Sequence, residues 1–459
     1  MALWIVPGAP LPHGEGWRIW CCAPGEQEFP APRVQVMRKG VLQAMDSSEW
    51  SLLPRVSGLG RRMGVLTLRL RPTEVEPGAM YEFRIAEDAM PKPVRWRSLP
   101  RGIGPDGVTF LTASCFWHDS DREGTYAAGL KEIGKLHQPA FKFLLGDQVY
   151  ADWPSEWGIG GSAARLYAGR YAQYWSDEAY REALRTCPNF FTCDDHEFWN
   201  DYPERQIHLY RTWTQARRDR YGEAADQLYY AYQRCLNPHE GRWYQFTIDP
   251  VSFFVTDTRS QREVYRKDGN AQFIPDAQWQ ALEQWQQSLR GPGVLVLGQP
   301  LFQKDGDWKD HSLSNFSRDY ARLWALIERS LKGDNDHRQP HDILVLSGDI
   351  HTGRYAEAHG PISDAKHGVP EFIASPASMI VPGSTDVEAP PDRITVSVDG
   401  KRRYWVVDRA HVPIMTLDHN VGVVRMIPGT RERGQPRVRF ECLLYRIRPY
   451  DGRSWWEKA

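Results

Sequence analysis

Residue types that bind metal ions follow three apolar stretches of the sequence, each time where the stretch ends. In chain order they are Asp147 and Tyr150 after 141–145, Asp194, Asp195 and His196 after 190–193, and Asp349 and His351 after 342–347. Carboxylate oxygens and imidazole nitrogens are common metal ligands. Several carboxylates at the ends of neighbouring buried strands repel one another and are costly to desolvate unless cations neutralise them. The pattern therefore predicts a metal site.

Each group alone also has a purely structural explanation. Aspartate is a favoured N-cap, so Asp194 and Asp195 could begin a helix, and a Gly-Asp pair often forms a turn. The sequence contains four Gly-Asp pairs, however, and only those ending in Asp147 and Asp349 follow an apolar run. The three groups together favour a metal site over separate caps and turns.

Cys115 and Tyr150 extend the possible ligand set. Cys115 closes the apolar stretch 108–115, and Tyr150 lies shortly after Asp147. Taken alone, Cys115 reads more simply as a small buried hydrophobic residue. As ligands, a thiolate and a phenolate suit a softer or Fe(III)-like ion, whereas carboxylate oxygens suit a second, harder ion. The residues thus predict a mixed site.

Strands alternate with helices from residue 108 onward, which predicts an α/β fold. The expected strands are 108–115, 141–145, 190–193, 251–259, 294–297 and 342–347, and further strands beyond about 390, including 421–427, are expected in a second sheet on the same core. The expected helices are 126–136, 163–184, 204–235 and 276–289. Because open α/β sheets place their ligands beyond the carboxyl ends of strands, this arrangement brings the three groups together.

The first part of the chain has a different pattern. Short extended runs, separated by proline and glycine, predict a small antiparallel β-sandwich of immunoglobulin-like type; they are 17–21, 33–36, 65–70 and 80–85. The Pro/Gly-rich stretch 99–105 is expected to be a linker. We therefore predict an N-terminal β domain at 1–105 and a second domain, which carries the metal site, at 106–459.

Composition excludes several classes of function. The net charge is −1, with 57 basic and 58 acidic residues, so no global field favours nucleic acid or an anionic membrane. No stretch approaches the length of a membrane span. Seven cysteines, an odd number, do not form an obvious disulfide framework. Together with a first segment that lacks an export signal, this predicts a cytoplasmic protein. The oligomeric state stays open.

The motifs resemble those of the alkaline phosphatase D (PhoD-like) family of metallophosphatases. The resemblance extends from about Thr109 to the C-terminal strands, and its motifs are Ala113-Ser114-Cys115, Gly146-Asp147-Gln148-Val149-Tyr150, Asp194-Asp195-His196-Glu197 with Asn200, Asp257-Thr258-Arg259 and Ser347-Gly348-Asp349-Ile350-His351. It implies a metallophosphatase fold, a β-sandwich core of two mixed sheets flanked by helices. It also implies a hydrolase that acts on small phosphate esters.

The resemblance further implies which residues hold the ions. Fe(III) would be bound by Cys115, Asp147, Tyr150 and His351. Asp147 would bridge to one or two divalent ions (Ca, Mn or Zn) held by Asp195, Asn200 and Asp349, with Asp194 as a possible substitute for Asp195. Two features depart from the family pattern: the usual asparagine pair is Asn200-Asp201 here, and the twin-arginine signal is missing.

Phosphate-ester chemistry assigns roles to the remaining residues. A hydroxide bridging two ions would attack phosphodiesters or phosphomonoesters, and His196 would assist the leaving alkoxide. Arg259 is expected either to bind phosphate or to form a structural ion pair with Asp257 or another carboxylate. His118 is expected at the surface rather than at the mouth of the site.

Two functional hypotheses remain at this point. The first is a dimetal phosphoesterase, and the second is a non-catalytic binding or structural protein that retains a metal site. Both Asp147 and His196 are present, which favours the enzyme, since a decayed site usually loses its bridging ligand or its acid. The tryptophan-rich loop with Trp153 and Trp157 is expected either to line the substrate groove or to pack against the core.

Overall fold

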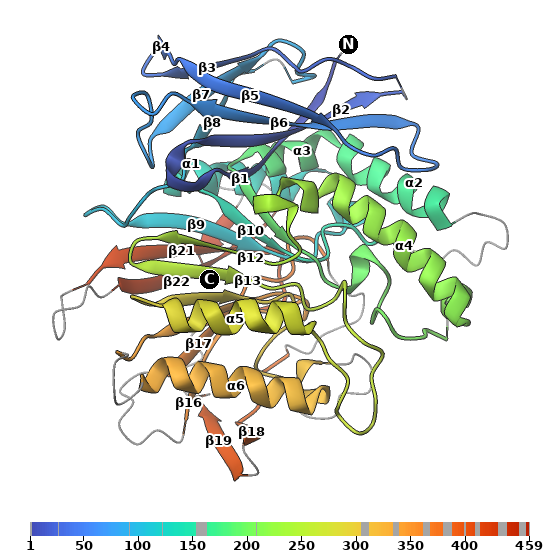
Figure 1. Ribbon diagram of the computed structural model, residues 1–459, viewed down its shortest axis with the longest axis vertical. Helices are drawn as coiled ribbons and strands as arrows, with labels where there is room; N and C mark the ends of the chain where they lie inside the picture. Colours follow the sequence, from blue (N-terminus) through green and yellow to red (C-terminus); the bar gives the residue numbers. More distant parts are fainter. Residues whose placement is uncertain are drawn as a thin grey trace.

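A computed structural model gives the structure of the protein. It describes residues 2–25, 27–90, 92–121, 123–152, 163–207, 209–303, 312–333, 339–360, 368–379, 388–398, 401–408, 414–429, 438–448 and 456–458. The loop with Trp153 and Trp157 lies outside these residues. The mixed α/β class predicted from the sequence is confirmed, and Figure 1 shows one group of strands at the top and another at the centre, with helices between the two groups and in front of the central one.

The N-terminal region is all-β, as predicted. Its strands form two four-stranded antiparallel sheets, in the orders β1-β2-β6-β5 and β4-β3-β7-β8. The bounds are β1 Trp4–Pro10, β2 Gly16–Pro24, β3 Val34–Arg38, β4 Val41–Leu42, β5 Met45–Leu52, β6 Arg61–Leu70, β7 Met80–Ile85 and β8 Val94–Arg97. Apolar side chains from both sheets, among them Trp17, Tyr81 and Trp96, share one core.

The first sheet of the remaining chain has six strands in the order β11-β10-β9-β21-β22-β23. The bounds are β9 Val108–Ala113, β10 Lys142–Leu145, β11 Asn189–Thr192, β21 Asn420–Pro428, β22 Val438–Ile447 and β23 Trp456–Lys458. Strands β9, β10 and β11 are parallel, and β21 lies antiparallel beside β9. The ends of β9, β10 and β11 therefore face the same edge of the sheet.

The second sheet has nine strands among the described residues, with β12-β13-β14-β15-β17-β16-β19-β18 in order and β20 beside β16. The bounds are β12 Tyr244–Ile248, β13 Val251–Val255, β14 Gly293–Val296, β15 Ile343–Ser347, β16 Gly353–His359, β17 Val369–Ile373, β18 Arg393–Val398, β19 Lys401–Val407 and β20 Met415–Thr416. Strands β13, β14, β15 and β17 are parallel. Strands β13, β14 and β15 consist almost entirely of apolar residues and are buried on both faces.

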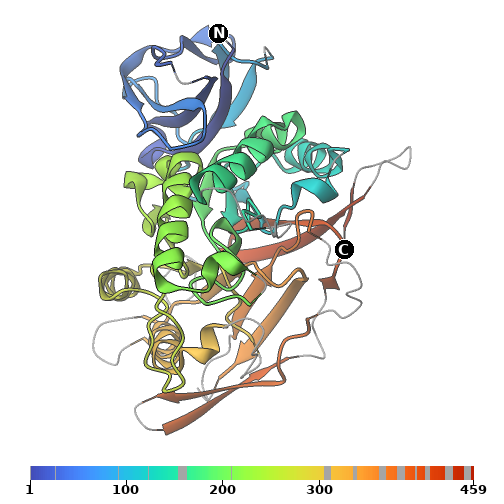
Figure 2. The ribbon, with the colours of Figure 1, turned by 90° about the vertical axis from the view of Figure 1, so that its right-hand side faces the viewer.

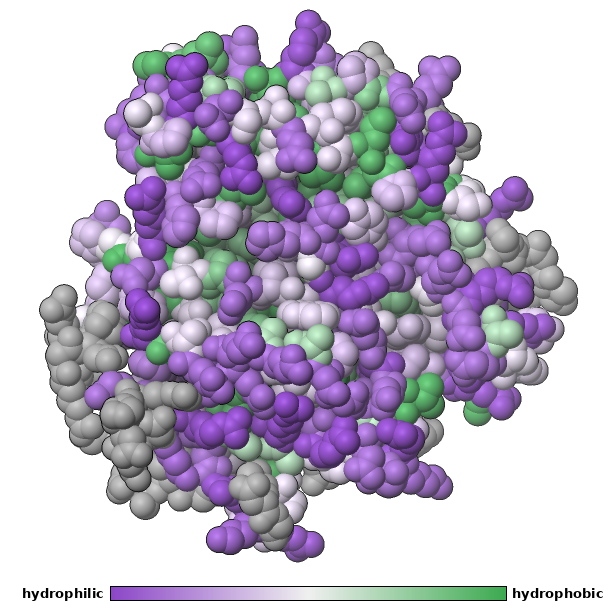
Figure 3. All heavy atoms as spheres, in the orientation of Figure 1, coloured by the Kyte–Doolittle hydropathy of each residue, from purple (hydrophilic) through white to green (hydrophobic). Residues whose placement is uncertain are grey.

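The helices cover the outer faces of the two sheets. The bounds are α1 Thr125–His137, α2 Ala163–Ser176, α3 Glu178–Arg185, α4 Gln215–Tyr232, α5 Asp276–Ser288 and α6 Ser317–Lys332. Phenylalanines 110, 143 and 253 contribute to a core that the two sheets share. Helices α1 to α4 pack on the six-stranded sheet, and α5 and α6 pack on the nine-stranded sheet. The outward faces of α5 and α6 are mainly hydrophilic (Figure 3).

The N-terminal sheets are attached to the rest of the chain by polar contacts of buried side chains. The indole nitrogens of Trp20 and Trp96 donate to the carbonyls of Ala231 and Arg185, and the Arg185 guanidinium pairs with Asp88 at 2.6 Å. Val6, Trp20 and Cys22 also join the core beneath α1 to α4. The two parts of the chain thus share buried surface.

Two predicted helices need correction, and a third helix was not predicted. The predicted helix 163–184 is two helices, because Asp177 accepts a hydrogen bond from the Tyr180 amide and begins α3. The predicted helix 204–235 begins only at Gln215. Helix α6 was not predicted from the sequence. Among the helices that the structure describes, none combines the length and apolar character that crossing a membrane requires.

Candidate metal centre

The three groups of ligand-type residues meet at the ends of strands from both sheets. Cys115 follows β9, Asp147 follows β10, Asp194 and Asp195 follow β11, and Asp349 follows β15. The two sheets approach closely here, since a Cβ atom on Gly348 would lie 2.6 Å from the Ser114 side chain. Strand ends that are far apart in sequence therefore deliver their side chains into one buried volume.

The backbone at these strand ends is unusual. Cys115, Asp147, Asp349 and His351 have φ angles of 59°, 54°, 75° and 49°. This left-handed region is rarely used by residues other than glycine, and such residues cluster at functional sites. Gly146, at φ 95°, makes the turn before Asp147 possible, because a Cβ atom there would lie 2.5 Å from that of Asp194. The sharp turns aim the ligand-type side chains away from the sheet edge.

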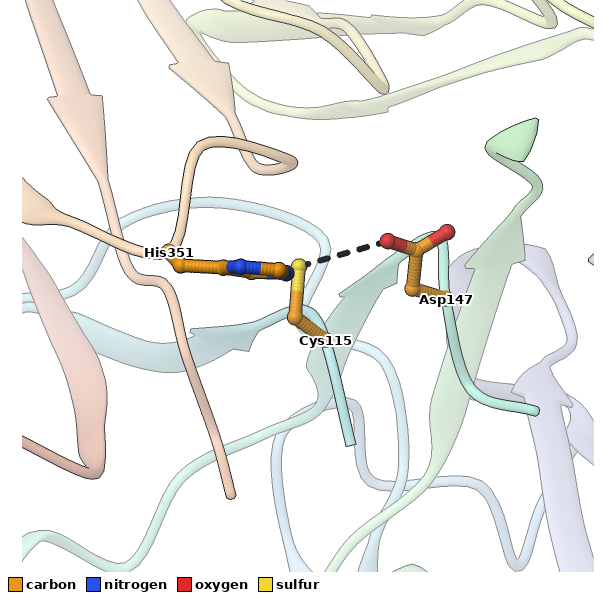
Figure 4. Close-up of side chains that lie close together, drawn as sticks. All are labelled: Cys115, Asp147 and His351. Atoms are coloured by element: carbon orange, nitrogen blue, oxygen red, sulfur yellow. Dashed lines mark hydrogen bonds between the residues drawn. The ribbon is translucent and has the colours of Figure 1, made fainter. Parts of the chain in front are cut away.

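One cluster combines sulfur, oxygen and nitrogen ligands. The Cys115 Sγ lies 3.5 Å from Asp147 Oδ2, and the Tyr150 hydroxyl lies 3.5 Å from the same oxygen. The Tyr150 hydroxyl is also 3.0 Å from His351 Nε2. Figure 4 shows the His351 ring and the Asp147 carboxylate on either side of the Cys115 sulfur. Potential ligand atoms of Cys115, Asp147 and His351 all lie within 4.8 Å of one another, which is close enough to hold one ion.

A second cluster contains only carboxylates and shares Asp147 with the first. Ligand oxygens of Asp147, Asp194, Asp195 and Asp349 lie within 4.8 Å of one another. The Asp195 Oδ1 atom is buried and has no hydrogen-bond partner among the described residues. Each of the two carboxylates has one oxygen engaged by the protein: Arg259 Nε donates to Asp194 Oδ1 at 2.6 Å, and the Asp201 backbone amide donates to Asp195 Oδ2. The Arg259 guanidinium already compensates the charge of Asp194 in a buried ion pair, so Asp195 fits a ligand role better than Asp194.

The environment disfavours ionisation of the free ligands. Burial, followed by the charges of Asp195 and Asp194, raises the pKa of Asp147 well above its usual range, although His196 acts against this. Burial and the neighbouring Asp147 likewise raise the pKa of the Cys115 thiol. A cation reverses both effects because it stabilises the deprotonated forms. The Asp147 carboxyl and the Cys115 thiol are therefore expected to lose their protons when a cation binds.

His196 lies between the clusters and a further carboxylate. The His196 Nδ1 atom is 2.7 Å from Asp152 Oδ1. The other oxygen of Asp152, Oδ2, accepts a hydrogen bond from the Asn200 backbone amide at 2.8 Å. Burial alone lowers the pKa of His196, but the charges of Asp152, Asp195 and Asp147 outweigh burial and raise the pKa well above its usual value. Asp152 thus orients the ring and favours the imidazolium. The sequence analysis missed Asp152, whose only signal was a carboxylate two positions after Tyr150.

Glu197 is a second residue whose role sequence reasoning missed. This fully buried carboxylate accepts from the backbone amides of Asp147 at 2.9 Å, Gln148 at 2.7 Å and Asp194 at 3.0 Å. Its fourth donor is Gln233 Nε2 at 3.2 Å. Glu197 therefore ties the end of β10 to the end of β11 and fixes the separation of two ligand-bearing turns.

We expect Glu197→Gln to weaken metal binding about 10- to 100-fold, the usual effect of losing a residue that orients metal ligands. The substituted amide nitrogen faces backbone N–H donors and cannot accept their hydrogen bonds. Metal titration of the purified variant measures the change. Glu328→Gln is the matched control, because Glu328 on α6 is also buried but pairs with Lys332 of the same helix and with Arg403 of β19. Equal metal affinity in both variants would contradict the positioning role.

Arg259 is fully buried in an ion pair. Besides Asp194, its guanidinium contacts the Tyr202 carbonyl at 3.2 Å and lies 3.8 Å from Asp201 Oδ1. These contacts correspond to the structural alternative considered for Arg259, with Asp194 rather than Asp257 as its charged partner. Asp257 instead accepts from the backbone amides of Arg259 and Ser260. The phosphate-binding role of Arg259 stays a prediction.

Contacts with neighbours of the centre place the remaining predicted residues, Asn200 and His118. Asn200 follows the 3₁₀ turn Asp195–Glu197, and its backbone amide donates a hydrogen bond to Asp152. His118 is partly buried, with its ring nitrogens 3.4 Å from Asp119 and 3.5 Å from Asp177. The ring of His118 lies beside Tyr174, whose hydroxyl is 3.4 Å from the Tyr150 amide. His118 is therefore partly buried beside Tyr174, whereas the sequence analysis expected it at the surface.

Comparisons with known proteins identify the family. The model of the PhoD-like phosphatase family matches residues 110–425, which include every ligand candidate. A solved structure of PhoD superposes with a TM-score of 0.62 at 16% identity, over 99% of this chain and 91% of that chain. A structure of GAP50, the anchor in the inner membrane complex of Plasmodium, gives a TM-score of only 0.36 at 12% identity, over 77% of this chain and 88% of that chain. No curated protein matches significantly. The chain belongs to the PhoD-like phosphatase family of metal-dependent phosphoric ester hydrolases.

Proposed function

We propose that the protein hydrolyses phosphodiesters, phosphomonoesters or both at a centre of two or more ions that share Asp147. The observation that carries this proposal is the presence of Asp147 in both ligand clusters. A carboxylate common to two adjacent sets of ligands is the arrangement that a bridging ligand requires. A single structural ion would need only one of the two sets.

The residues fit the expected ions. Cys115, Tyr150 and His351 would complete one site with Asp147, and this thiolate, phenolate and imidazole set favours Fe(III). Asp195, Asn200 and Asp349 would complete a site for Ca, Mn or Zn, and the unpartnered Asp195 Oδ1 supports it. When bound, such ions make a nucleophile available from water at neutral pH and neutralise charge on the phosphoryl oxygens.

The chain's own residues contribute positioning and a proton. Asp152 holds Nδ1 of His196, which leaves Nε2 to face a leaving group. An imidazolium in that position donates its Nε2 proton to the departing alkoxide oxygen. Glu197 keeps the two turns that carry Asp147 and Asp194 in register. Burial of the cluster excludes bulk water and strengthens these electrostatic effects.

The domain division belongs to the same proposal. Residues 1–105 would form an immunoglobulin-like module, and 106–459 would form the catalytic domain. The change from two antiparallel sheets to parallel strands at β9, which begins at Val108, supports a boundary near residue 105. The ligand-type residues all lie after this boundary.

A panel of aryl phosphate esters tests the proposed activity. We expect metal-loaded protein to release p-nitrophenolate from a diester, a monoester or both, and a triester serves as the neutral comparison. No turnover of any ester by protein with both sites loaded would reject the phosphoesterase and favour a protein that only retains the metal site.

We expect Tyr150→Phe to remove or shift most of the visible absorption of the oxidised protein. A phenolate bound to Fe(III) gives a charge-transfer band, and the band should fade with dithionite. Tyr174→Phe is the matched control, because Tyr174 is buried next to Tyr150 but belongs to α2. A colourless and iron-free but active protein would reject iron while leaving the two-ion mechanism intact.

A further inference from the structure

The segment between the metal centre and α4 exposes aromatic and aliphatic side chains. Ile207, Tyr210 and Trp213 are 81%, 51% and 43% exposed. The Tyr210 and Trp213 rings meet edge to face, with centroids 5.3 Å apart. Together with Arg205 and Arg217 these residues form what we call the 205–217 surface. Contiguous exposed apolar patches rimmed by polar residues are typical of interaction sites.

Arginines lie over the exposed rings. The Arg217 guanidinium is 3.9 Å from the Tyr210 ring centroid, and its Nη2 donates to the Tyr210 hydroxyl at 2.7 Å. The Arg205 guanidinium is 5.7 Å from the Trp213 ring centroid. Within the part of the chain that the structure describes, no carboxylate forms an ion pair with Arg205 or Arg217. The surface therefore combines flat groups with uncompensated positive charge.

The local sequence makes this charge imbalance clear. Residues 203–220 contain five arginines but only two acidic residues, Glu204 and Asp219. The Glu204 carboxylate accepts a hydrogen bond from the Tyr265 backbone amide, and the Asp219 carboxylate accepts one from Gln215 Nε2 at 2.7 Å. An apolar protein segment would gain little from this surface. A ligand that is both planar and anionic matches it in shape and in charge.

The surface is directly connected to the metal centre. The Asp201 backbone amide donates to Asp195 Oδ2, and Gln206 Nε2 lies 3.5 Å from Asp201 Oδ2. Figure 1 shows the green chain of this segment beside the start of α4. The segment that carries the 205–217 surface is thus joined through Asp201 to a carboxylate of the metal centre.

We propose that the 205–217 surface binds the non-leaving group of a phosphodiester substrate and that this group carries a planar aromatic ring, as a nucleoside does. The inference rests on the proposed phosphoesterase function and specifies its substrate class. Aromatic and guanidinium planes stack on bases without regard to base identity. A phosphomonoester has no second ester group to place there, so the surface favours diesters.

Two esters with the same leaving group test this inference. One is the p-nitrophenyl ester of thymidine 5′-monophosphate, and the other is ethyl p-nitrophenyl phosphate. We expect the wild type to prefer the thymidine ester in kcat/KM. Tyr210→Ala and Trp213→Ala should each lower this preference about 5- to 100-fold, the range for losing one stacked base, mainly through a higher KM.

Tyr404→Ala is the matched control. Tyr404 is an exposed tyrosine on β19 that also lies under an arginine, Arg393, at 5.0 Å. Its variant should keep the wild-type ratio. Equal preference for both esters in the wild type, or an unchanged ratio in both variants of the 205–217 surface, overturns the inference. An equal loss of kcat/KM for both esters also overturns the inference, because it indicates that the side chains support the fold. A changed oligomeric state with an unchanged preference ratio overturns it as well. Failure of the wild type to cleave either ester contradicts the proposed function instead.

Discussion

Asp147→Asn is expected to lower kcat/KM for phosphate esters by roughly three orders of magnitude or more and to release metal from both sites. Asp147 belongs to both ligand clusters, so its replacement weakens two sites at once. Asparagine offers one neutral carbonyl oxygen where aspartate offers two charged oxygens. Metal ions stabilise charge in the transition state by several kcal/mol. Since about 1.4 kcal/mol corresponds to a tenfold change in rate, losing this stabilisation lowers kcat/KM by roughly three orders of magnitude.

Metal content by elemental analysis and initial rates, measured on the same sample, check this expectation. Asp319→Asn is the matched control, since Asp319 lies on α6 and is similarly buried, but it accepts from the Phe273 backbone amide. Its variant should keep metal and activity. An Asp147→Asn protein with full metal content and full turnover would contradict the bridging role.

The second large effect is expected for His196→Ala, with a loss of about 10²- to 10⁴-fold in kcat and little change in bound metal. The loss should shrink for esters with good leaving groups, because p-nitrophenolate departs without protonation. Rates for a series of aryl and alkyl esters, plotted against leaving-group pKa, measure this dependence. A loss of equal size across the series would indicate positioning instead of proton donation.

Two further variants support the interpretation of His196. Asp152→Asn should produce the same dependence on the leaving group with a smaller amplitude, because the ring remains but its charged partner is gone. His359→Ala serves as the control, since its ring lies on β16 and is about half exposed. A loss in the control similar to that in His196→Ala would show that the assay reports on fold rather than on the site.

The parts of the fold that could be predicted are those with a strong local signal. Continuous apolar runs gave β10, β13, β14 and β15 because strands buried on both faces need them. Helix α6 was missed although Leu323, Ile327 and Leu331 recur at helical spacing on its buried side. The start of α4 was placed too early because 204–214 has helix-like composition. Tertiary contacts keep residues 204–214 out of the α-helix; for example, the Tyr265 backbone amide donates a hydrogen bond to the Glu204 carboxylate.

Ligand-type residues could be recognised because Gly-Asp after an apolar run marks a sharp turn at a strand end. The supporting residues could not. Glu197 acts on the amides of Asp147 and Gln148, about fifty positions earlier in the chain. The pairing of Arg259 with Asp194 spans 65 positions, so no local pattern distinguished it from the Asp257 alternative. Contacts between distant strand ends exist only once both sheets are assembled.

The most direct test of the two-ion centre is metal analysis combined with reversible removal of the ions. We predict at least two ions per chain in the active protein, loss of ester hydrolysis on chelation and recovery only when both classes of ion, iron and a divalent ion, are returned. Hydrolysis that persists at full rate in protein stripped of metal would contradict the account.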